Sequence, residues 1–373
     1  MNQRPIHNPR ITPLHRILSA FVASLMMTFP FSVFANELPQ GGSVTAGEAT
    51  IGSAGSAMNI NQASQRAIID WQSFSVGQAN AVFINQPSAT SALLSRVNGV
   101  DPSVILGTLQ ANGSLYLLNP NGVIFGENAT IDVGSILAST MDMTNDNFLA
   151  GRDAFEGNSD ATIENRADIA AQDFVAFLAK NIVNSGRIQA PRIAMSAGVG
   201  SLELDHAYGG AITIDLQGVQ GDFDNSGVID ASSLVDSYDG GAIVIQGENL
   251  SNTGSILADA SGNGSNGGAI EYSAGGNAIH EGVMSASSAQ GKGGAISVTG
   301  ENVGVAGTVA ADGLADPQGG NNGGYIEFAS TNNAVFAPTA RVSAKGNGEI
   351  RINQPGSDVA AFEKTATILY DGA

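Results

Sequence analysis

Beyond residue 36 the chain alternates apolar and polar residues over short segments, and turn-forming residues separate these segments. Two examples are Ala242-Ile243-Val244-Ile245 and Ser255-Ile256-Leu257-Ala258, with Gly, Asn and Ser between them. Alternation with a period of two predicts β-strands, and the spacing of an amphipathic helix is missing from any window of a dozen residues. The pattern therefore predicts an all-β protein.

A double glycine followed by such a segment recurs five times, at spacings of 31, 27, 26 and 30 residues. A repeat of this length is typical of a solenoid, in which each unit packs only on its neighbours. Glycine and asparagine are expected to supply positive φ angles at the turns. The copies are Gly209-Gly210-Ala211-Ile212, Gly240-Gly241-Ala242-Ile243, Gly267-Gly268-Ala269-Ile270, Gly293-Gly294-Ala295-Ile296 and Gly323-Gly324-Tyr325-Ile326.

A second signal runs out of phase with the first: a small residue, an apolar β-former two residues later, then Ala. Because the strands of one repeat cannot close a core alone, they should stack in register on the next repeat as a parallel β-helix with small residues at its tight corners. A β-sandwich is the alternative, since it too is built from many short strands. The copies begin at Gly186, Gly227, Gly254, Gly282 and Gly307, with weaker ones at Ala167 and Ala340, and the inward corner residues would include Ala231, Ala258, Ala286 and Ala311.

The spacings also predict the size of one coil. Ala167 and Gly186 lie 19 residues apart, and Gly186 and Gly227 lie 41 apart, which we interpret as two coils of about 20 residues. The repeats of 25–33 residues would then be one coil with a protruding loop. With neighbouring strands about 4.8 Å apart, a dozen or so coils would form a rod of roughly 60 Å.

Residues 1–35 are predicted to be a secretory signal peptide. Three arginines lie in a stretch without acidic residues, and an apolar run over residues 17–34 follows. Val33 and Ala35 place small residues at positions −3 and −1 of a cleavage site before Asn36. The alternative is an N-terminal transmembrane anchor, since this run nearly suffices to span a bilayer.

The composition narrows the classes of partner and site. The 373 residues include no Cys and carry a formal charge of −19, which becomes −22 once residues 1–35 are removed. The lack of Cys excludes disulfides and Cys-ligated metals. The acidic charge repels phosphates, so no nucleic-acid partner is expected. An exported, soluble protein is the expectation.

The block from about residue 41 to 145 is less repetitive and richer in large apolar side chains. It contains Asn119-Pro120-Asn121-Gly122-Val123 within Leu-x-Asn-Pro-Asn-Gly-Val-x-Phe-Gly, Ala111-Asn112-Gly113, and a stretch from Gln86-Pro87-Ser88 to Arg96-Val97-Asn98-Gly99. On these motifs, Ser43 to Thr140 resembles the amino-terminal secretion domain of two-partner secretion exoproteins, the filamentous haemagglutinin and haemolysin-like family of Gram-negative bacteria.

The resemblance implies a right-handed parallel β-helix with an N-terminal cap over about residues 36–290. Residues 36–150 would be the core of the two-partner secretion (haemagglutination activity) domain, and residues 151–373 would continue the β-helix repeats. The implied partner is an outer-membrane β-barrel transporter with periplasmic substrate-binding domains. The chain would then fold outside the cell as a secreted or extracellular protein, with or without retention at the outer-membrane surface. An adhesin or surface-interaction role, directed at a host-cell or surface receptor, is the expected function.

The same resemblance assigns the transporter-recognition or secretion motif. Physically, Pro120 fixes φ near −65° and Asn121-Gly122 suits the positive φ of a tight turn, so two apolar strands should meet at a reversal. Either this turn serves folding alone, or it orders a surface that the transporter recognises by adding an extended segment to a sheet edge. The motif residues are Asn119, Pro120, Asn121, Gly122 and Val123, supported by Gln86, Pro87, Arg96, Asn112 and Gly113.

No catalytic residue, metal site or cofactor is expected. Beyond the signal peptide the chain has only two histidines, His206 and His280, which excludes a three-His zinc site. Residues 262–267 satisfy Gly-x-Gly-x-x-Gly but precede a strand, so they predict a turn. Residues 222–230 match the first nine positions of a calcium-binding hand loop, yet position twelve is Ser233 and the repeat register predicts strand there.

An enzyme remains the competing class, because parallel β-helices also host polysaccharide lyases and hydrolases. Acidic residues such as Asp236, Asp239, Asp259 and Glu271 could line a groove. Surface acids on so acidic a chain ordinarily solvate it, however, and a single Trp beyond the signal peptide offers little platform for sugar binding. A non-enzymatic exoprotein is therefore the expectation, with a carbohydrate-active β-helix enzyme as the alternative.

Overall fold

The computed structural model of the protein describes residues 37–205, 212–314, 322–353, 361–362 and 367–369. The expected signal peptide with its cleavage site at Ala35 and Asn36 lies outside these residues. So do His206 and the double glycine Gly209-Gly210.

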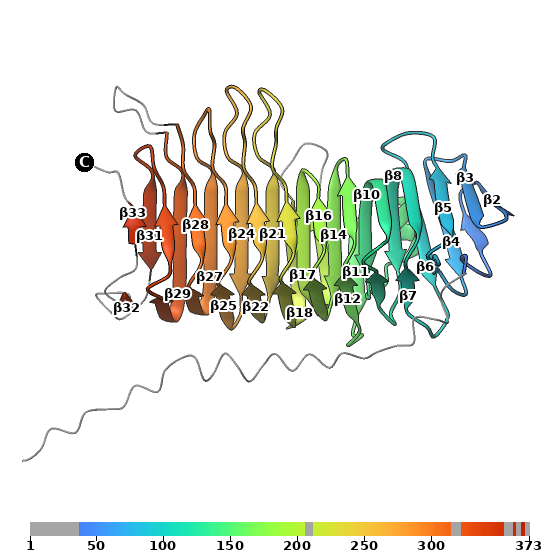
Figure 1. Ribbon diagram of the computed structural model, residues 1–373. Coiled ribbons are helices and arrows are strands. Elements are labelled where there is room, and N and C mark those ends of the chain that lie inside the picture. Colours follow the sequence, from blue (N-terminus) through green and yellow to red (C-terminus); the bar gives the residue numbers. More distant parts are fainter. Residues whose placement is uncertain (1–36, 206–211, 315–321, 354–360, 363–366, 370–373) are drawn as a thin grey trace, which may run out of the picture. The chain divides into compact units, whose positions relative to one another are not determined.

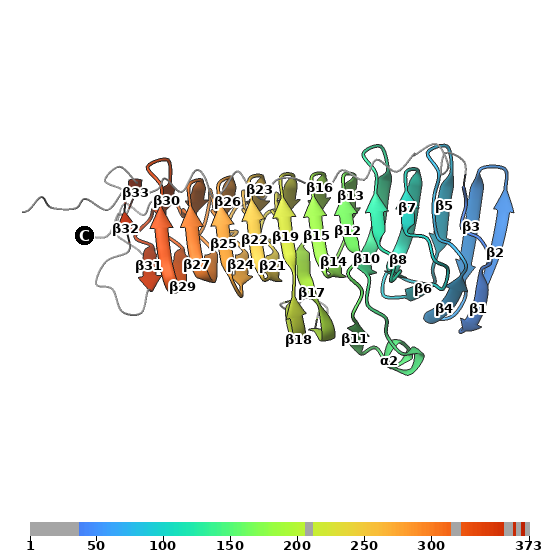
Figure 2. The ribbon, with the colours of Figure 1, turned by 90° about the horizontal axis from the view of Figure 1, so that it is seen from below.

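The described strands wind into a right-handed parallel β-helix with three faces (Figures 1 and 2). The predicted β-helix is thus confirmed, and the β-sandwich is wrong because the faces are built from parallel pairings between successive coils. Face 1 contains β4 (Arg66–Trp71), β6 (Ala92–Val97), β8 (Thr108–Leu118), β10 (Thr130–Ser139), β14 (Phe174–Ala179), β17 (Arg192–Asp205), β21 (Ala242–Gly247), β24 (Ala269–Ala274), β27 (Ala295–Val305), β29 (Tyr325–Phe336) and β31 (Glu349–Asn353).

The other two faces follow face 1 around each coil. Face 2 contains β7 (Ser103–Ile105), β9 (Val123–Phe125), β12 (Thr162–Asn165), β15 (Asn181–Asn184), β19 (Asp222–Asn225), β22 (Asn249–Asn252), β25 (Asn277–His280), the C-terminal parts of β27 and β29, and β32 (Ala361–Phe362). Face 3 contains β3 (Ala57–Gln62), β5 (Ala81–Asn85), the N-terminal parts of β8 and β10, β13 (Asp168–Ala171), β16 (Arg187–Gln189), β20 (Val228–Asp230), β23 (Ser255–Leu257), β26 (Val283–Ser285), β28 (Thr308–Ala310), β30 (Arg341–Ser343) and β33 (Thr367–Leu369).

The described part of face 3 has twelve layers, in agreement with the predicted dozen coils. At about 4.8 Å per layer they span roughly 50 Å. The implied N-terminal cap is present, because β1 (Ser43–Ala46) and β2 (Ala49–Ala54) pair antiparallel with β4 and β3. The division of the chain at residue 150 stays a prediction.

One prediction of coil length is wrong. The 41 residues from Gly186 to Gly227 form one coil, because β16 pairs directly with β20. The extra length leaves the solenoid: β17 continues beyond face 1 and pairs antiparallel with β18 (Thr213–Gln220) on one side and β11 (Asp153–Gly157) on the other. We call these three strands the side sheet; the short helix α2 (Asn145–Leu149) precedes β11.

The side sheet covers the outer surface of face 1 and creates a second apolar core that the repeat pattern did not predict. Outward residues of face 1 such as Leu94, Tyr116 and Leu178 pack with Phe155 and Leu202 of the side sheet. Strand β14 is consequently buried along its whole length. The main core lies inside the coils, and burying each large aliphatic or aromatic side chain there stabilises the fold by about 1.5–3 kcal/mol.

The double glycines have a different cause from the predicted one. None of those described has a positive φ. They stand where the loops between faces 3 and 1 leave and rejoin the coil, and a Cβ on Gly268 would lie 2.0 Å from the carbonyl oxygen of Gly241 in the coil before. Close backbone approach therefore requires them. The predicted protruding loops are confirmed and stack beside one another from β20–β21 to β28–β29 (Figure 1).

The predicted inward corner residues are also confirmed. Ala231, Ala258, Ala286 and Ala311 are buried. Each accepts a backbone hydrogen bond from the second glycine of a pair, as Ala258 does from Gly268. A larger side chain at these positions would have no space between the loop and the core.

A column of buried amides runs inside the turn between faces 2 and 3. The side-chain Nδ2 of Asn165 donates to Oδ1 of Asn184 (2.8 Å), Asn184 donates to Asn225 (2.7 Å), and Asn225 donates to Asn252 (2.6 Å). All four are at most 1% exposed. Because each amide satisfies the next, the column avoids the roughly 1–3 kcal/mol that an unpaired buried polar group costs.

His280 ends this column. Its Nδ1 lies 2.9 Å from Asn252 Nδ2, and its Nε2 lies 2.9 Å from the carbonyl oxygen of Thr308. A carbonyl can only accept, so Nε2 carries the proton and Nδ1 accepts from Asn252. Burial lowers the pKa of His280, and the bond to Thr308 only partly opposes this.

We expect a loss of stability on the acid side that depends on His280. Below its ordinary pKa of about 6.5, the unfolded chain binds a proton that the folded chain excludes, so the free energy of unfolding falls as the pH drops from there towards the lowered pKa. His280→Asn continues the amide column and should remove this component. Thermal unfolding of both proteins from pH 8 to pH 5 measures it, with pH 8 as the reference for any offset from the smaller side chain. Parallel curves for the two proteins would contradict the expectation.

Candidate functional site

The motif from Asn119 to Val123 forms the corner between face 1 and face 2. Gly122 N donates to the Asn119 carbonyl (3.0 Å), which closes a four-residue turn. Gly122 has a positive φ of 107°, as predicted, whereas Asn121 is not among the residues with positive φ. The predicted reversal is wrong: β8 pairs with β6 and β10, and β9 pairs with β7 and β12, so the chain turns a corner of the coil.

Asn119 is fully buried and fixes this corner to the coil before it. Its Nδ2 donates to the Asp101 carbonyl and to Ser103 Oγ, both at 3.0 Å. Its Oδ1 accepts from the backbone N (2.9 Å) and Nδ2 (3.1 Å) of Asn121. The amide thus uses both its donors and its acceptor, a combination that neither Asp nor Leu can reproduce.

The motif's other members divide between the interior and the surface. Val123 is buried in the main core, and Asn121 is half-buried and donates to the Gly99 carbonyl (2.9 Å). Pro120 is exposed, and its carbonyl accepts from Ser159 Oγ (2.5 Å). Pro120 also lines a small cavity of about 210 Å³, together with Leu118 and Arg96.

The supporting residues Gln86, Asn112 and Gly113 meet at another corner, between faces 3 and 1. Gln86 N donates to Asn112 Oδ1 (2.7 Å), Asn112 Nδ2 donates to the Gln86 carbonyl (2.9 Å), and Gly113 N donates to Gln86 Oε1 (2.9 Å). A Cβ on Gly113 would lie 2.6 Å from the Ser91 carbonyl oxygen. Pro87 follows Gln86 on the half-buried loop that leads to β6. This corner is therefore a backbone clamp between consecutive coils.

Arg96 belongs to neither corner and holds the segment before α2 on face 1. Its guanidinium pairs with Asp70 (3.2 Å) and Asp142 (2.8 Å) and donates to the Met143 carbonyl (2.7 Å) and to Asn145 Oδ1 (2.9 Å). The side chain is only 13% exposed. The structure thus brings Arg96 and Pro120 to one cavity and places Gln86, Asn112 and Gly113 elsewhere.

The sequence analysis missed the residues that attach α2. Arg66 Nη1 donates to the Phe148 carbonyl (2.7 Å), and its guanidinium carbon lies 5.0 Å from the centre of the Phe148 ring. Tyr116 Oη donates to Asp153 Oδ2 (2.9 Å), and burial, aided by that carboxylate, raises the pKa of Tyr116 well above its ordinary value. These partners are 37–82 residues apart in sequence, and no local pattern marks them.

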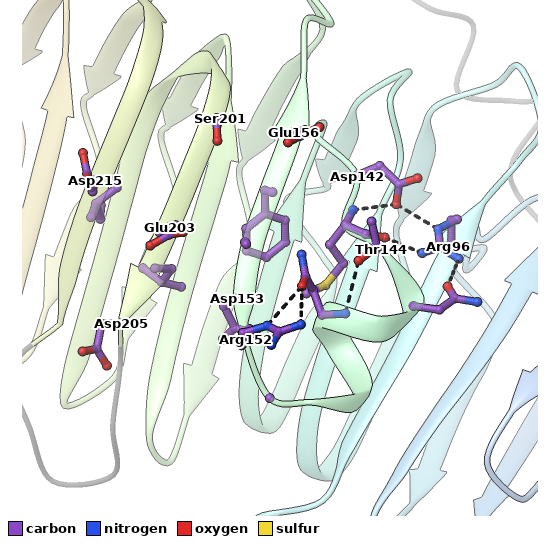
Figure 3. A pocket seen from close by; sticks show the side chains of 18 of the residues that line it. Arg96, Asp142, Thr144, Arg152, Asp153, Glu156, Ser201, Glu203, Asp205 and Asp215 are labelled. Carbon is purple, nitrogen blue, oxygen red and sulfur yellow. Dashed lines mark hydrogen bonds and ion pairs between the residues drawn. The ribbon is translucent and has the colours of Figure 1, made fainter.

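Between α2 and the side sheet lies a groove of about 1150 Å³ (Figure 3). Its rim carries Asp142 and Glu156 beside Arg96 on one side, and Glu203, Asp205 and Asp215 on the other. Carboxylates outnumber arginines among its lining residues, so its potential is negative.

The two decoy motifs form the structures that the repeat register predicts. Residues 222–230 contain β19 and β20, and Asn225 points into the amide column. Residues 262–267 lie in a loop before β24. Within the described ranges no group of three His, Asp or Glu side chains is placed to hold a metal ion, and none of the helices found there is long and apolar enough to cross a membrane.

Comparisons with known proteins identify curated relatives. The chain is 33% identical over 212 residues to a heme/hemopexin-binding protein of Haemophilus influenzae strain Rd, an alignment that covers 54% of this chain and 23% of the relative. A second heme/hemopexin-binding protein of H. influenzae is 46% identical over 86 residues, covering 23% of this chain and 9% of the relative. The chain thus corresponds to less than a quarter of the length of either relative.

Among solved structures, the HMW1 secretion domain of H. influenzae matches with a TM-score of 0.73 at 23% identity, over 88% of this chain and 99% of that one. This similarity shows the fold. The model of the TPS secretion domain family matches residues 35–272, well over half of the chain. The chain therefore belongs to the TPS secretion domain family, whose members are the secretion domains of two-partner secretion exoproteins.

Proposed function

We propose that this domain is recognised by an outer-membrane β-barrel transporter through periplasmic substrate-binding domains, and that the corner from Asn119 to Val123 is needed for that step. The observation that carries the proposal is the division of this corner into buried and exposed parts. Asn119 is fully buried, whereas Pro120 is exposed beside the cavity that Arg96 and Leu118 line. Pro120 can contact a partner of the folded domain, and Asn119 can do so only before folding.

We further propose that the exported rod acts without catalysis, as an adhesin or surface-interaction protein that contacts a host-cell or surface receptor, with or without retention at the outer-membrane surface. Three of the candidate catalytic acids support this, because they join stacked loops. Asp236 accepts from Asn263 N (2.8 Å), Asp239 accepts from Asn266 N (2.7 Å), and Asp259 accepts from Ser287 N (2.6 Å). Turnover of an acidic polysaccharide by the purified protein would favour the alternative, a carbohydrate-active enzyme.

Asn119→Asp should reduce secretion by destabilising the corner. The substitution removes the donor to Asp101 and Ser103 and buries a carboxylate there, so we expect a loss of about 3 kcal/mol of folding free energy. Extracellular yield with the coexpressed transporter, together with denaturant unfolding of the purified protein, measures both effects. Asn128→Asp is the matched control, since it adds the same charge to an exposed turn of the same coil. Unchanged yield and stability would refute the structural role.

Pro120→Ala should reduce secretion with little effect on stability, because the ring is exposed and the turn keeps its hydrogen bond from Gly122 to Asn119. We expect a several-fold drop in extracellular yield and a change in unfolding free energy within about 1 kcal/mol. Pro191→Ala, at an exposed corner of a later coil, is the control and should be secreted normally. If Pro120→Ala is also secreted normally, the corner serves folding alone.

A further inference from the structure

The side sheet ends in a strand with a free edge. All eight residues of β18 pair with β17 in regular antiparallel register. No other strand among the described residues pairs with the second side of β18. Figure 2 shows β17 and β18 projecting together from the coils near α2 and β11. The edge contains no Pro or Lys and no bulge, the features that commonly prevent a further strand from pairing.

Below this edge the second apolar core is left open. Ile214 and Leu216 of β18 point towards face 1 and are half-buried. They adjoin Ala242 and Val244 of β21, which are also only partly buried. A further strand beside β18 would cover this apolar rim with every second side chain.

The opposite side of the sheet is acidic. Asp215 lies directly across from Glu203 in the pairing of β18 with β17, and like charges in that arrangement destabilise a sheet. Glu156 of β11 lies on the same groove. A cationic side chain placed beside Asp215 and Glu203 would relieve this repulsion.

We propose that the free edge of β18 is a strand-addition site for an extended segment of another protein, in which apolar residues alternate with Lys or Arg. The apolar set would cover Ile214, Leu216 and Val244, and the basic set would lie beside Asp215 and Glu203. A second copy of this chain fits poorly, because pairing two β18 edges would bring an acidic face against an acidic face. The site belongs to the folded rod and is independent of the proposed role of the corner at Asn119 in secretion.

The test titrates the folded protein, residues 36–373, into a fluorescent eight-residue peptide of alternating Lys and Val, followed by fluorescence anisotropy. We expect saturable binding that weakens at least fivefold between 50 and 500 mM NaCl, since the charged contacts are exposed to solvent. A Glu–Val peptide, and a Lys–Val peptide with a central Pro that cannot complete the hydrogen-bond ladder, should bind at least tenfold more weakly.

Two variants locate the site. Asp215→Lys and Val244→Lys change the acidic and apolar halves of the surface, both at partly or fully exposed positions, and each should weaken binding at least fivefold. Asp168→Lys makes the same charge change at an exposed position on face 3 and should leave binding unchanged. Circular dichroism and thermal unfolding establish that each variant is folded, and Asp215→Asn replaces Asp215→Lys if the latter is not.

Three outcomes would overturn the proposal. One is no saturable binding of the Lys–Val peptide up to millimolar protein. Another is equal weakening by Asp168→Lys, which would mean that the peptide responds only to net charge. The third is a dimer in sedimentation that Asp215→Lys dissociates, because the occupant would then be a second copy of the chain.

Discussion

In-register stacking of coils is the constraint on which the rest of this structure depends. Each strand takes its backbone hydrogen bonds from the coil before and offers its own to the coil after, so side chains at equivalent positions lie in columns. An apolar column closes the core without further partners. A polar column is tolerated only where each member satisfies the next, as the amides from Asn165 to Asn252 do. The same rule requires an end to the column, and His280 provides it through the Thr308 carbonyl.

Stacking also explains the chemistry of the motif residues. A corner must satisfy backbone groups that no strand pairs, and Asn119 does so by binding the coil before it at Asp101 and Ser103. Gln86 and Asn112 do the same at a second corner. Amides suit these places because one side chain both donates and accepts. These residues therefore report first on how consecutive coils are joined, and a transporter that meets the chain before it folds would read the same residues as an extended sequence.

The sequence could predict what repeats and could not predict what leaves the repeat. The alternating segments and regular spacings indicated the β-helix, its inward alanines and its protruding loops, because each coil imposes the same local requirement. The 41-residue step was misread since the extension of β17 and strand β18 also alternate apolar and polar residues. Contacts such as Tyr116–Asp153 and Arg66–Phe148 join segments with no shared pattern. The double glycines were found, but their cause is the space between neighbouring loops, which only the three-dimensional packing reveals.

The side sheet and the stacked loops treat exposed backbone in opposite ways. In the loops, each backbone segment binds the next loop, and Asp236 and Asp239 strengthen this joining through Asn263 and Asn266. The side sheet occurs once and has no copy in the next coil, so β18 keeps one edge unpaired among the described strands. A repeat protein can cover its edges by repetition, and an insertion cannot. A surface that needs an outside strand to complete it is therefore expected at the insertion, where this chain also places its open apolar rim and its opposed carboxylates.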